Sequence, residues 1–524
     1  MKTLFVNGRV YTLDPGKPEV TAIAVSGGRI TAVGRNQEIL DLKGPGDEVI
    51  DLEGRAALPG FTDSHAHFLS FCERFEEVDL EGAASLEEAL RRVREGAAAA
   101  PAAAWITGGG WNKNLWGGFP TRLDLDRVVP ARPVALSSKD GHALWVNSKA
   151  LAAAGVTGET ADPPNGAIQR GADGEPTGIL FEFAQELVYR HVPPRTPEDN
   201  ARLLRRGIRE AHARGLVGVH CPEGAASFRA FQDLRAAGEL DFRVFMMIPA
   251  EELQAAAAVG LRTGFGDEFL RVGAIKAFAD GALGPQTACM IADYEGRPGY
   301  RGIPTTTPEA MRELVASATR AGLSMAVHAI GDLANRLVLD AYEAVAGESR
   351  ARGLRHRIEH AQLLHPDDLP RFAALGVIAS VQPIHATSDR YIADRHWGAR
   401  ARLAYAFRSL LNSGARLCFG SDAPVESIDP LKGIYAAVTR KREDEPASEP
   451  WYPKERLSVE EAVRGYTDWA AYASYEERRR GTLSPGKLAD LVVLSRDIFR
   501  EPPEVIPETR VLMTVVGGKV VHRV

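Results

Sequence analysis

Short apolar runs alternate with amphipathic segments through the middle of the chain. Eight of these runs have the character of strands that end in polar residues, and they span 61–68, 216–220, 242–248, 272–278, 325–328, 356–360, 377–382 and 416–421. Helical spacing of apolar residues fills most of the intervals, for example over 308–321 and 333–346. Eight strands that alternate with helices predict a (β/α)8 barrel, with a doubly wound sheet as the rival. The rival is disfavoured because the chain lacks the glycine-rich phosphate-binding motifs that such sheets often carry.

Both ends of the chain have the pattern of short strands. In residues 1–57, β-rich runs are separated by Gly, Asn, Asp and Pro. The last 40 residues repeat this pattern, and the Gly517-Gly518 pair between two valine-rich runs is a hairpin signal. We therefore expect residues 1–57 and 484–524 to pair into one small β domain.

A long interval of about 145 residues separates the first two predicted barrel strands, where an ordinary connection has about 2–6. We therefore predict an insertion over 70–199, with the barrel formed by 58–69 and 200–483. Asp140, His142 and Trp145 combine a turn, an imidazole and a flat apolar ring, and with Trp111 they are our candidates for substrate contacts. A turn packed on the barrel remains the alternative for the first three, and a dimer contact for the loop tryptophans Trp111 and Trp116.

Composition narrows the class of protein. The 524 residues are 45% apolar, which permits a sizeable core. The net charge of −6 argues against a nucleic-acid binder, and no run approaches the ~18–20 apolar residues of a membrane span. The first residues lack a secretory signal, and the four cysteines form no C-x-x-C pair. We expect a cytoplasmic protein with a small-molecule substrate and no nucleic-acid or membrane partner.

Residue types that bind metals stand at the ends of five predicted strands, namely His65, His67, Lys276, His328, His360 and Asp422. In a barrel these strand ends meet at one mouth. Residues i and i+2 of a strand point to the same side, so His65 and His67 can grip one ion, and imidazole nitrogen suits zinc. A desolvated lysine loses its charge more readily, so Lys276 is able to react with carbon dioxide and give a bridging carbamate.

Each of these residues taken alone has a structural alternative: a core histidine, a salt-bridge lysine or a helix-capping aspartate. Their common place at strand ends predicts a metal site instead. Zinc is the first candidate, iron and manganese remain open, and the site holds one or two ions. His220 and Gln382 also end strands and face the mouth, whereas His385 and His396, in the loop after the seventh strand, are expected to be solvated.

The motifs resemble the amidohydrolase superfamily, and within it the YtcJ-like branch (amidohydrolase family 3) that includes N-substituted formamide deformylase. The matching segments are 60–67 (GFTDSHAH), 138–148 (SKDGHALWVNS), 276–284 (KAFADGALG), 328–332 (HAIGD), 358–362 (IEHAQ), 420–424 (GSDAP) and 481–494. The resemblance extends nearly from end to end. It departs at Gln286, where we expect an arginine, and this puts a role of that position in binding an anionic substrate in doubt.

The resemblance implies a metal-dependent barrel with a composite β-sandwich from both termini. It places the six strand-end residues at the family's ligand positions, with Lys276 as the carboxylated bridge and Asp422 as the base. It also implies hydrolysis of a C–N bond other than a peptide bond, such as an amide or an N-substituted formamide, by water that the metal activates. Asp280 and Gln382 are added as expected substrate contacts.

Two other functions stay open. The same metal chemistry serves a hydrolase of a lactone, an ester or another bond, or a deaminase, which only a substrate panel separates from an amidase. A non-catalytic scaffold of the same fold is the second alternative, and metal content distinguishes it. For the oligomeric state, a homodimer is the working expectation.

Overall fold

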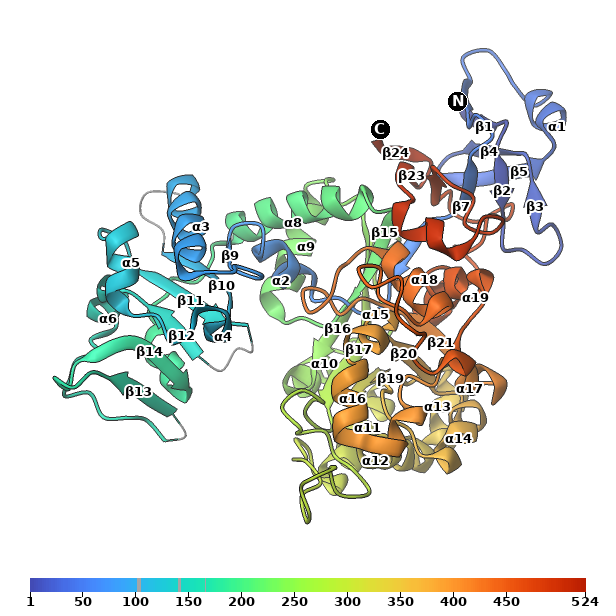
Figure 1. Cartoon of the computed structure of the whole chain (residues 1–524). Coiled ribbons are helices and arrows are strands. Elements are labelled where there is room, and N and C mark those ends of the chain that lie inside the picture. The colour runs from blue at the N-terminus through green and yellow to red at the C-terminus, as the bar shows by residue number, and fades with distance from the viewer. Residues whose placement is uncertain (101–104, 140–142, 165) are drawn as a thin grey trace. The chain divides into compact units, whose positions relative to one another are not determined.

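The computed structural model describes residues 1–100, 105–139, 143–164 and 166–524. The chain divides into two compact units (Figure 1). The first contains residues 1–69 and 204–524, and the second contains residues 70–203.

The first unit is built around a parallel sheet of eight strands within the described ranges. In chain order these are β8 (Phe61–Asp63), β15 (Leu216–Cys221), β16 (Arg243–Pro249), β17 (Leu270–Phe278), β18 (Ser324–Ala329), β19 (Arg357–His360), β20 (Ile378–Val381) and β21 (Arg416–Phe419). Each strand pairs with the next one. The Ser64 N–H also donates to the Phe419 carbonyl at 2.8 Å, so the first and last strands meet. The predicted (β/α)8 barrel is confirmed, and the doubly wound alternative is wrong.

The barrel strands are buried because helices cover them, which is why they are continuous apolar runs and not alternating ones. Every residue of β15 is buried. Helix α11 (Pro308–Ala321) shows how the helices between strands begin and end: the Thr307 side chain accepts from the Ala310 N–H, and Gly322 closes the helix at a φ of 75°. Helices α12 (Asp332–Ala344) and α14 (Leu369–Leu375) follow β18 and β19. Because all eight strands run parallel, the polar residues that follow them gather at the same end of the barrel.

Strands from both termini form two further sheets in the first unit (Figure 1). One contains β1 (Lys2–Val6), β4 (Ala22–Ser26), β5 (Arg29–Gly34) and β6 (Glu48–Asp51). The other contains β2 (Arg9–Tyr11), β3 (Glu19–Val20), β7 (Ala56–Pro59), β22 (Leu491–Leu494), β23 (Val511–Val516) and β24 (Lys519–Arg523). One core cluster joins Phe5 and Ile23 to Leu491 and Val515, so the two ends of the chain pair as expected.

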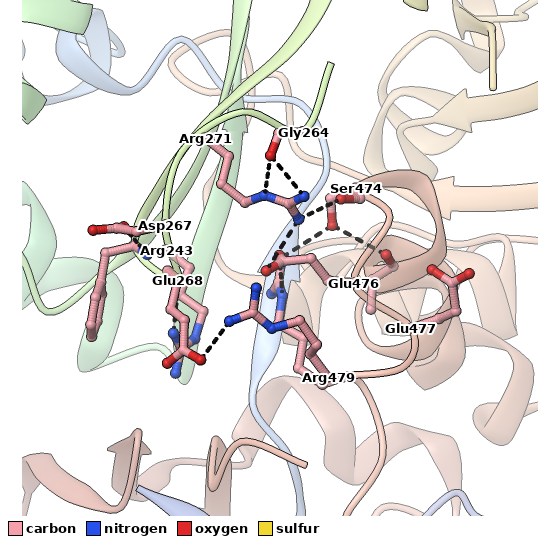
Figure 2. A network of polar contacts seen from close by, with 12 residues as sticks. Arg243, Gly264, Asp267, Glu268, Arg271, Ser474, Glu476, Glu477 and Arg479 are labelled. Atoms are coloured by element: carbon pink, nitrogen blue, oxygen red, sulfur yellow. Dashed lines mark hydrogen bonds and ion pairs between the residues drawn. The ribbon is translucent and has the colours of Figure 1, made fainter. Parts of the chain in front are cut away.

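Buried and half-buried ion pairs connect these sheets to the starts of the barrel strands. Arg243, at the start of β16, donates two hydrogen bonds of 2.7 Å to the Asp490 carboxylate, just before β22. Figure 2 shows the surrounding network, in which Glu268 accepts from Arg479. Glu268 also accepts from Arg29 of β5 at 2.7 Å. These contacts hold the end of the barrel opposite the polar strand ends.

The second unit contains a mixed sheet in the order β13 (Gly166–Arg170), β14 (Pro176–Glu182), β12 (Ala143–Val146), β11 (Val134–Ser138), β10 (Ile106–Trp111) and β9 (Val78–Asp79). Helices α3 (Leu86–Ala99) and α5 (Arg122–Val128) pack against each other. Among the helices in the described part of the whole chain, none combines the length and apolarity that a bilayer span needs.

Candidate metal centre

A cavity of about 370 Å³ lies at the carboxyl ends of the barrel strands. All six predicted metal ligands line it, although they are spread from position 65 to position 422: His65, His67, Lys276, His328, His360 and Asp422. The structure therefore brings together the residues that the strand-end pattern singled out.

His65, His67 and Asp422 form the first group of donors in this cavity. The Asp422 Oδ1 atom lies 3.4 Å from His65 Nε2 and 3.5 Å from His67 Nε2. The buried Asp63 carboxylate fixes both segments, because it accepts the N–H groups of His65 at 2.9 Å and Ser421 at 3.1 Å. His65 Nε2 is buried and has no hydrogen-bond partner among the described residues. A buried nitrogen of this kind points to a ligand.

A buried carboxylate orients His65. The Nδ1 atom of His65 contacts Glu359, which leaves Nε2 toward the cavity. Burial alone would raise the pKa of Glu359, but Arg357 and His65 hold it well below its ordinary value. Arg357 also donates to the Ser64 carbonyl and, at 2.8 Å, to the Ser380 hydroxyl. Metal-binding histidines commonly have such a carboxylate partner.

His328 and His360 are oriented in the same way by other acceptors. His360 Nδ1 donates to the Gln382 side-chain oxygen at 2.8 Å, and His328 Nε2 donates to the Gly281 carbonyl at 3.0 Å. Burial lowers the pKa of His328 to about 4 and that of His360 well below its ordinary value. Both rings are therefore neutral at pH 7, which is the form that binds metals.

Lys276 lies on β17 and is 4% exposed. Its ammonium makes no hydrogen bond to the described residues, and it lies 4.9 Å from the centre of the Phe278 ring. Burial lowers the pKa of Lys276 to about 8. The amine thus lies in the same cavity as the imidazoles, where the loss of hydration outweighs the attraction of the Glu359 and Asp422 carboxylates for its charge.

His385 is a cavity residue that the sequence interpretation missed. It lies on α15 (Pro383–Ser388) and is 9% exposed, so the expectation of a solvated side chain is wrong. Its ring is parallel to that of His360, with centres 6.1 Å apart. His385 is close to Asp422 as well, with 3.9 Å between Nε2 and Oδ2. The signal that could have found it is its position three residues after a strand-end glutamine.

Asp280 and Gln382 were expected to contact substrate, and both have other partners in the structure. Asp280 is 1% exposed and accepts three backbone N–H groups, so it ties together the loops that follow β17 and β18. Gln382 is 2% exposed and supports His360. At the position that departs from the family pattern, Gln286 accepts from Arg297 at 2.8 Å. His220 is fully buried, with Nδ1 3.0 Å from an Arg357 nitrogen.

The predicted substrate contacts in the insertion divide into two groups. Asp140 and His142 lie outside the described residues. Trp111 and Trp145 are 1% and 0% exposed, and they pack in the core of the second unit. Their ring N–H groups donate to backbone carbonyls at 2.8 and 2.9 Å. Both rings thus serve the packing of that unit, and a substrate role for them stays a prediction.

The rest of the cavity lining is mainly apolar, with Phe278, Leu283, Ile330, Ile392 and Val425. Asp389 and Glu426 add two carboxylates. Lys276 is the one basic side chain, histidines aside, among the described residues that line it. Acidic side chains thus outnumber the one basic side chain among the described lining residues.

The donor set fits a metal ion. Two sets of three side chains each bring one ligand atom per residue within 4.8 Å of the others in the set. One set is His65, His67 and Asp422, and the other is His360, His385 and Asp422. Imidazole nitrogens and a carboxylate suit zinc and other divalent transition metals. The buried Nε2 of His65, which has no hydrogen-bond partner in the described part of the chain, gives the same indication.

Comparison with known proteins gives a consistent result. The amidohydrolase family profile matches residues 48–522. The Arabidopsis thaliana Protein LONG AFTER FAR-RED 3 is 36% identical, over 98% of this chain and 91% of that protein. YtcJ of Bacillus subtilis is 34% identical, over 100% of this chain and 99% of that protein. N-substituted formamide deformylase of Arthrobacter pascens is 30% identical, over 98% of this chain and 97% of that protein.

A solved structure extends the likeness to the fold. It is the crystal structure of an uncharacterized metal-dependent hydrolase from Pyrococcus furiosus, with 31% identity, a TM-score of 0.81, and coverage of 95% of this chain and 100% of that one. Together with the family match over most of the sequence, these likenesses confirm the resemblance seen in the motifs. The chain belongs to the amidohydrolase family, in its YtcJ-like branch.

Proposed function

We propose that the protein is a metal-dependent hydrolase that cleaves an amide C–N bond, with N-substituted formamides as the first substrate class to examine. The observation that carries this proposal is the convergence of the six strand-end side chains on one cavity, where the buried Nε2 of His65 has no hydrogen-bond partner among the described residues. The 30% identical relative named N-substituted formamide deformylase supports the choice of substrate class.

One ion would be held by His65, His67 and Asp422. Lys276, His328 and His360 are the further ligands that the family resemblance implies. When bound, a divalent ion supplies Lewis-acid polarisation of the carbonyl and lowers the pKa of water. Lys276 would contribute as a carbamate. Its neutral amine attacks carbon dioxide, a C–N bond forms, and one proton is released, which replaces a repelling cation with an oxygen donor.

Asp422 is the proposed acid and base. Its Oδ1 faces His65 and His67, and its Oδ2 has no hydrogen bond to the described residues and lies toward His385. Oδ2 would receive a proton from the attacking water and pass it to the leaving nitrogen. The nitrogen would depart as an amine and the acyl group as a carboxylate.

The apolar lining would take the substituent of the substrate. Phe278, Ile330 and Val425 offer packing surface, and the carboxylates of Asp389 and Glu426 would favour an amine-bearing substituent. An anionic substituent would meet no arginine among the described lining residues.

A substrate panel tests the proposal. The protein is reconstituted with Zn²⁺, Fe²⁺ or Mn²⁺ and assayed with N-alkyl and N-benzyl formamides, acetamides, lactones, esters and an aminopyrimidine. We expect turnover of amides above the other classes. A preference for lactones or for deamination would replace the amidase by another hydrolase of the same site. Failure to retain any metal would favour the non-catalytic scaffold.

A further inference from the structure

We propose that His385 completes a second cation position together with His360 and Asp422, beside the position formed by His65, His67 and Asp422. The inference rests on the metal centre of the proposed function and concerns its ligands, not its substrate. In the ligand set that the family resemblance implies, His385 has no part.

The evidence begins with the place of His385. Its Nε2 atom is buried and has no hydrogen-bond partner among the described residues. The side chain lines the cavity, so this nitrogen is not simply enclosed by apolar packing. Buried polar atoms in native proteins nearly always have a partner, and one without a partner in a cavity points to a missing ligand.

The neighbours of His385 are the right ones for a cation. One ligand atom each from His360, His385 and Asp422 lie within 4.8 Å of one another. The two imidazole rings are parallel within 7°. His360 Nδ1 is already engaged by Gln382, so Nε2 is its free donor. Two imidazole nitrogens and a carboxylate oxygen make a three-ligand set, which is common for catalytic ions that keep a further position for water or substrate.

Asp422 links this position to the first one. Its Oδ1 is 3.4 Å from His65 Nε2, and its Oδ2 is 3.9 Å from His385 Nε2. The two oxygens of one carboxylate thus face two different donor groups. A carboxylate that binds ions through both oxygens has none left to accept a proton. We therefore expect that filling the second position opposes the acid and base role of Asp422.

Metal titration of the whole protein tests the assignment. Metal-free protein is titrated with Zn²⁺, and the number and affinity of bound ions are measured by calorimetry and by elemental analysis after dialysis. We expect two ions for the wild type. His385→Gln should retain the tighter ion and bind the weaker one about 100-fold less strongly or not at all. His65→Gln should instead weaken the tighter ion.

His396→Gln is the matched control, because His396 contacts Gln286 and does not line the cavity. It should bind both ions as the wild type does. Thermal unfolding of each metal-free variant confirms folding, and His385→Asn repeats the test if the glutamine variant fails to fold. Co²⁺ absorption gives an independent signature, because the band of the second ion should be lost with His385.

Two results would overturn the assignment: wild-type binding of both ions by His385→Gln, or a single ion in the wild type. An unchanged ion count with altered turnover would make His385 a substrate contact instead. The ion count requires no substrate, so it stands even if no amide is hydrolysed. If amides are hydrolysed, wild-type turnover should decline as Zn²⁺ exceeds one equivalent.

Discussion

Replacing Gln382 by leucine isolates one hydrogen bond that orients a metal ligand. Gln382 accepts from His360 Nδ1 at 2.8 Å, and both side chains are at least 94% buried, with exposures of 2% and 6%. The amide nitrogen of Gln382 has no hydrogen-bond partner among the described residues, so the substitution by leucine removes no other hydrogen bond of this side chain. Without the acceptor, His360 is free to take the tautomer or rotation that hides Nε2. Losses of this kind cost about 10–100-fold in metal affinity, or about 1.4–2.7 kcal/mol.

The assay is competition between a chromophoric chelator and the protein for Zn²⁺. Gln362→Leu is the control, because Gln362 lines the same cavity but donates to Asp389 at 3.3 Å and touches no metal-ligand imidazole through a hydrogen bond. Gln382→Glu should restore affinity, since a carboxylate also accepts from Nδ1. The metal-free leucine variant should lose about 1–3 kcal/mol of folding free energy, because the His360 N–H is left unpaired. Zn²⁺ affinity within threefold of the wild type would refute the orienting role.

Three further predictions concern other residues. Asp422→Asn should lower the turnover of the best amide about 100-fold or more while an ion remains bound, and near-normal turnover would remove Asp422 from proton transfer. A ¹³C NMR spectrum of the protein kept under ¹³C-labelled carbon dioxide should show a carbamate signal that is absent from Lys276→Met. A wild-type spectrum without that signal would exclude the carbamate. Asp490→Asn leaves the buried Arg243 charge unpaired and should cost about 3–5 kcal/mol in denaturant unfolding. Burial opposes ionisation of Asp490, but Arg243 lowers its pKa below the ordinary value. This stabilisation is therefore present above about pH 4 and lost as the pH falls through the folded-state pKa, and a wild type with no such acid-dependent loss relative to Asp490→Asn would contradict it.

The barrel and most of the cavity were predictable because the pattern that makes a buried parallel strand also marks its end. Met325–His328 illustrates this: three apolar residues are followed at once by a histidine, and the structure ends β18 one residue later. The strand boundaries were less predictable. The first run was expected to reach residue 68, but β8 ends at Asp63, because the backbone leaves the sheet where Asp63 begins to bond to His65 and Ser421.

The residues that support the ligands were hidden because their partners are remote in sequence. Glu359 and His65 are in contact although 294 positions separate them in the sequence, and no local sequence pattern predicts such a pair. His385 was missed for a different reason: it lies on a short helix after the strand and not at the strand end. Asp280 was expected to contact substrate on the strength of the family resemblance, yet in the structure its carboxylate accepts three backbone N–H groups.

Anomalous diffraction from crystals of the zinc-loaded protein, recorded on both sides of the zinc edge, tests the account most directly. We predict a peak within about 2.0–2.2 Å of His65 Nε2 and Asp422, and a second peak beside His360 and His385. Zinc bound elsewhere on the chain, with the nitrogen of His65 bonded only to water, would contradict it.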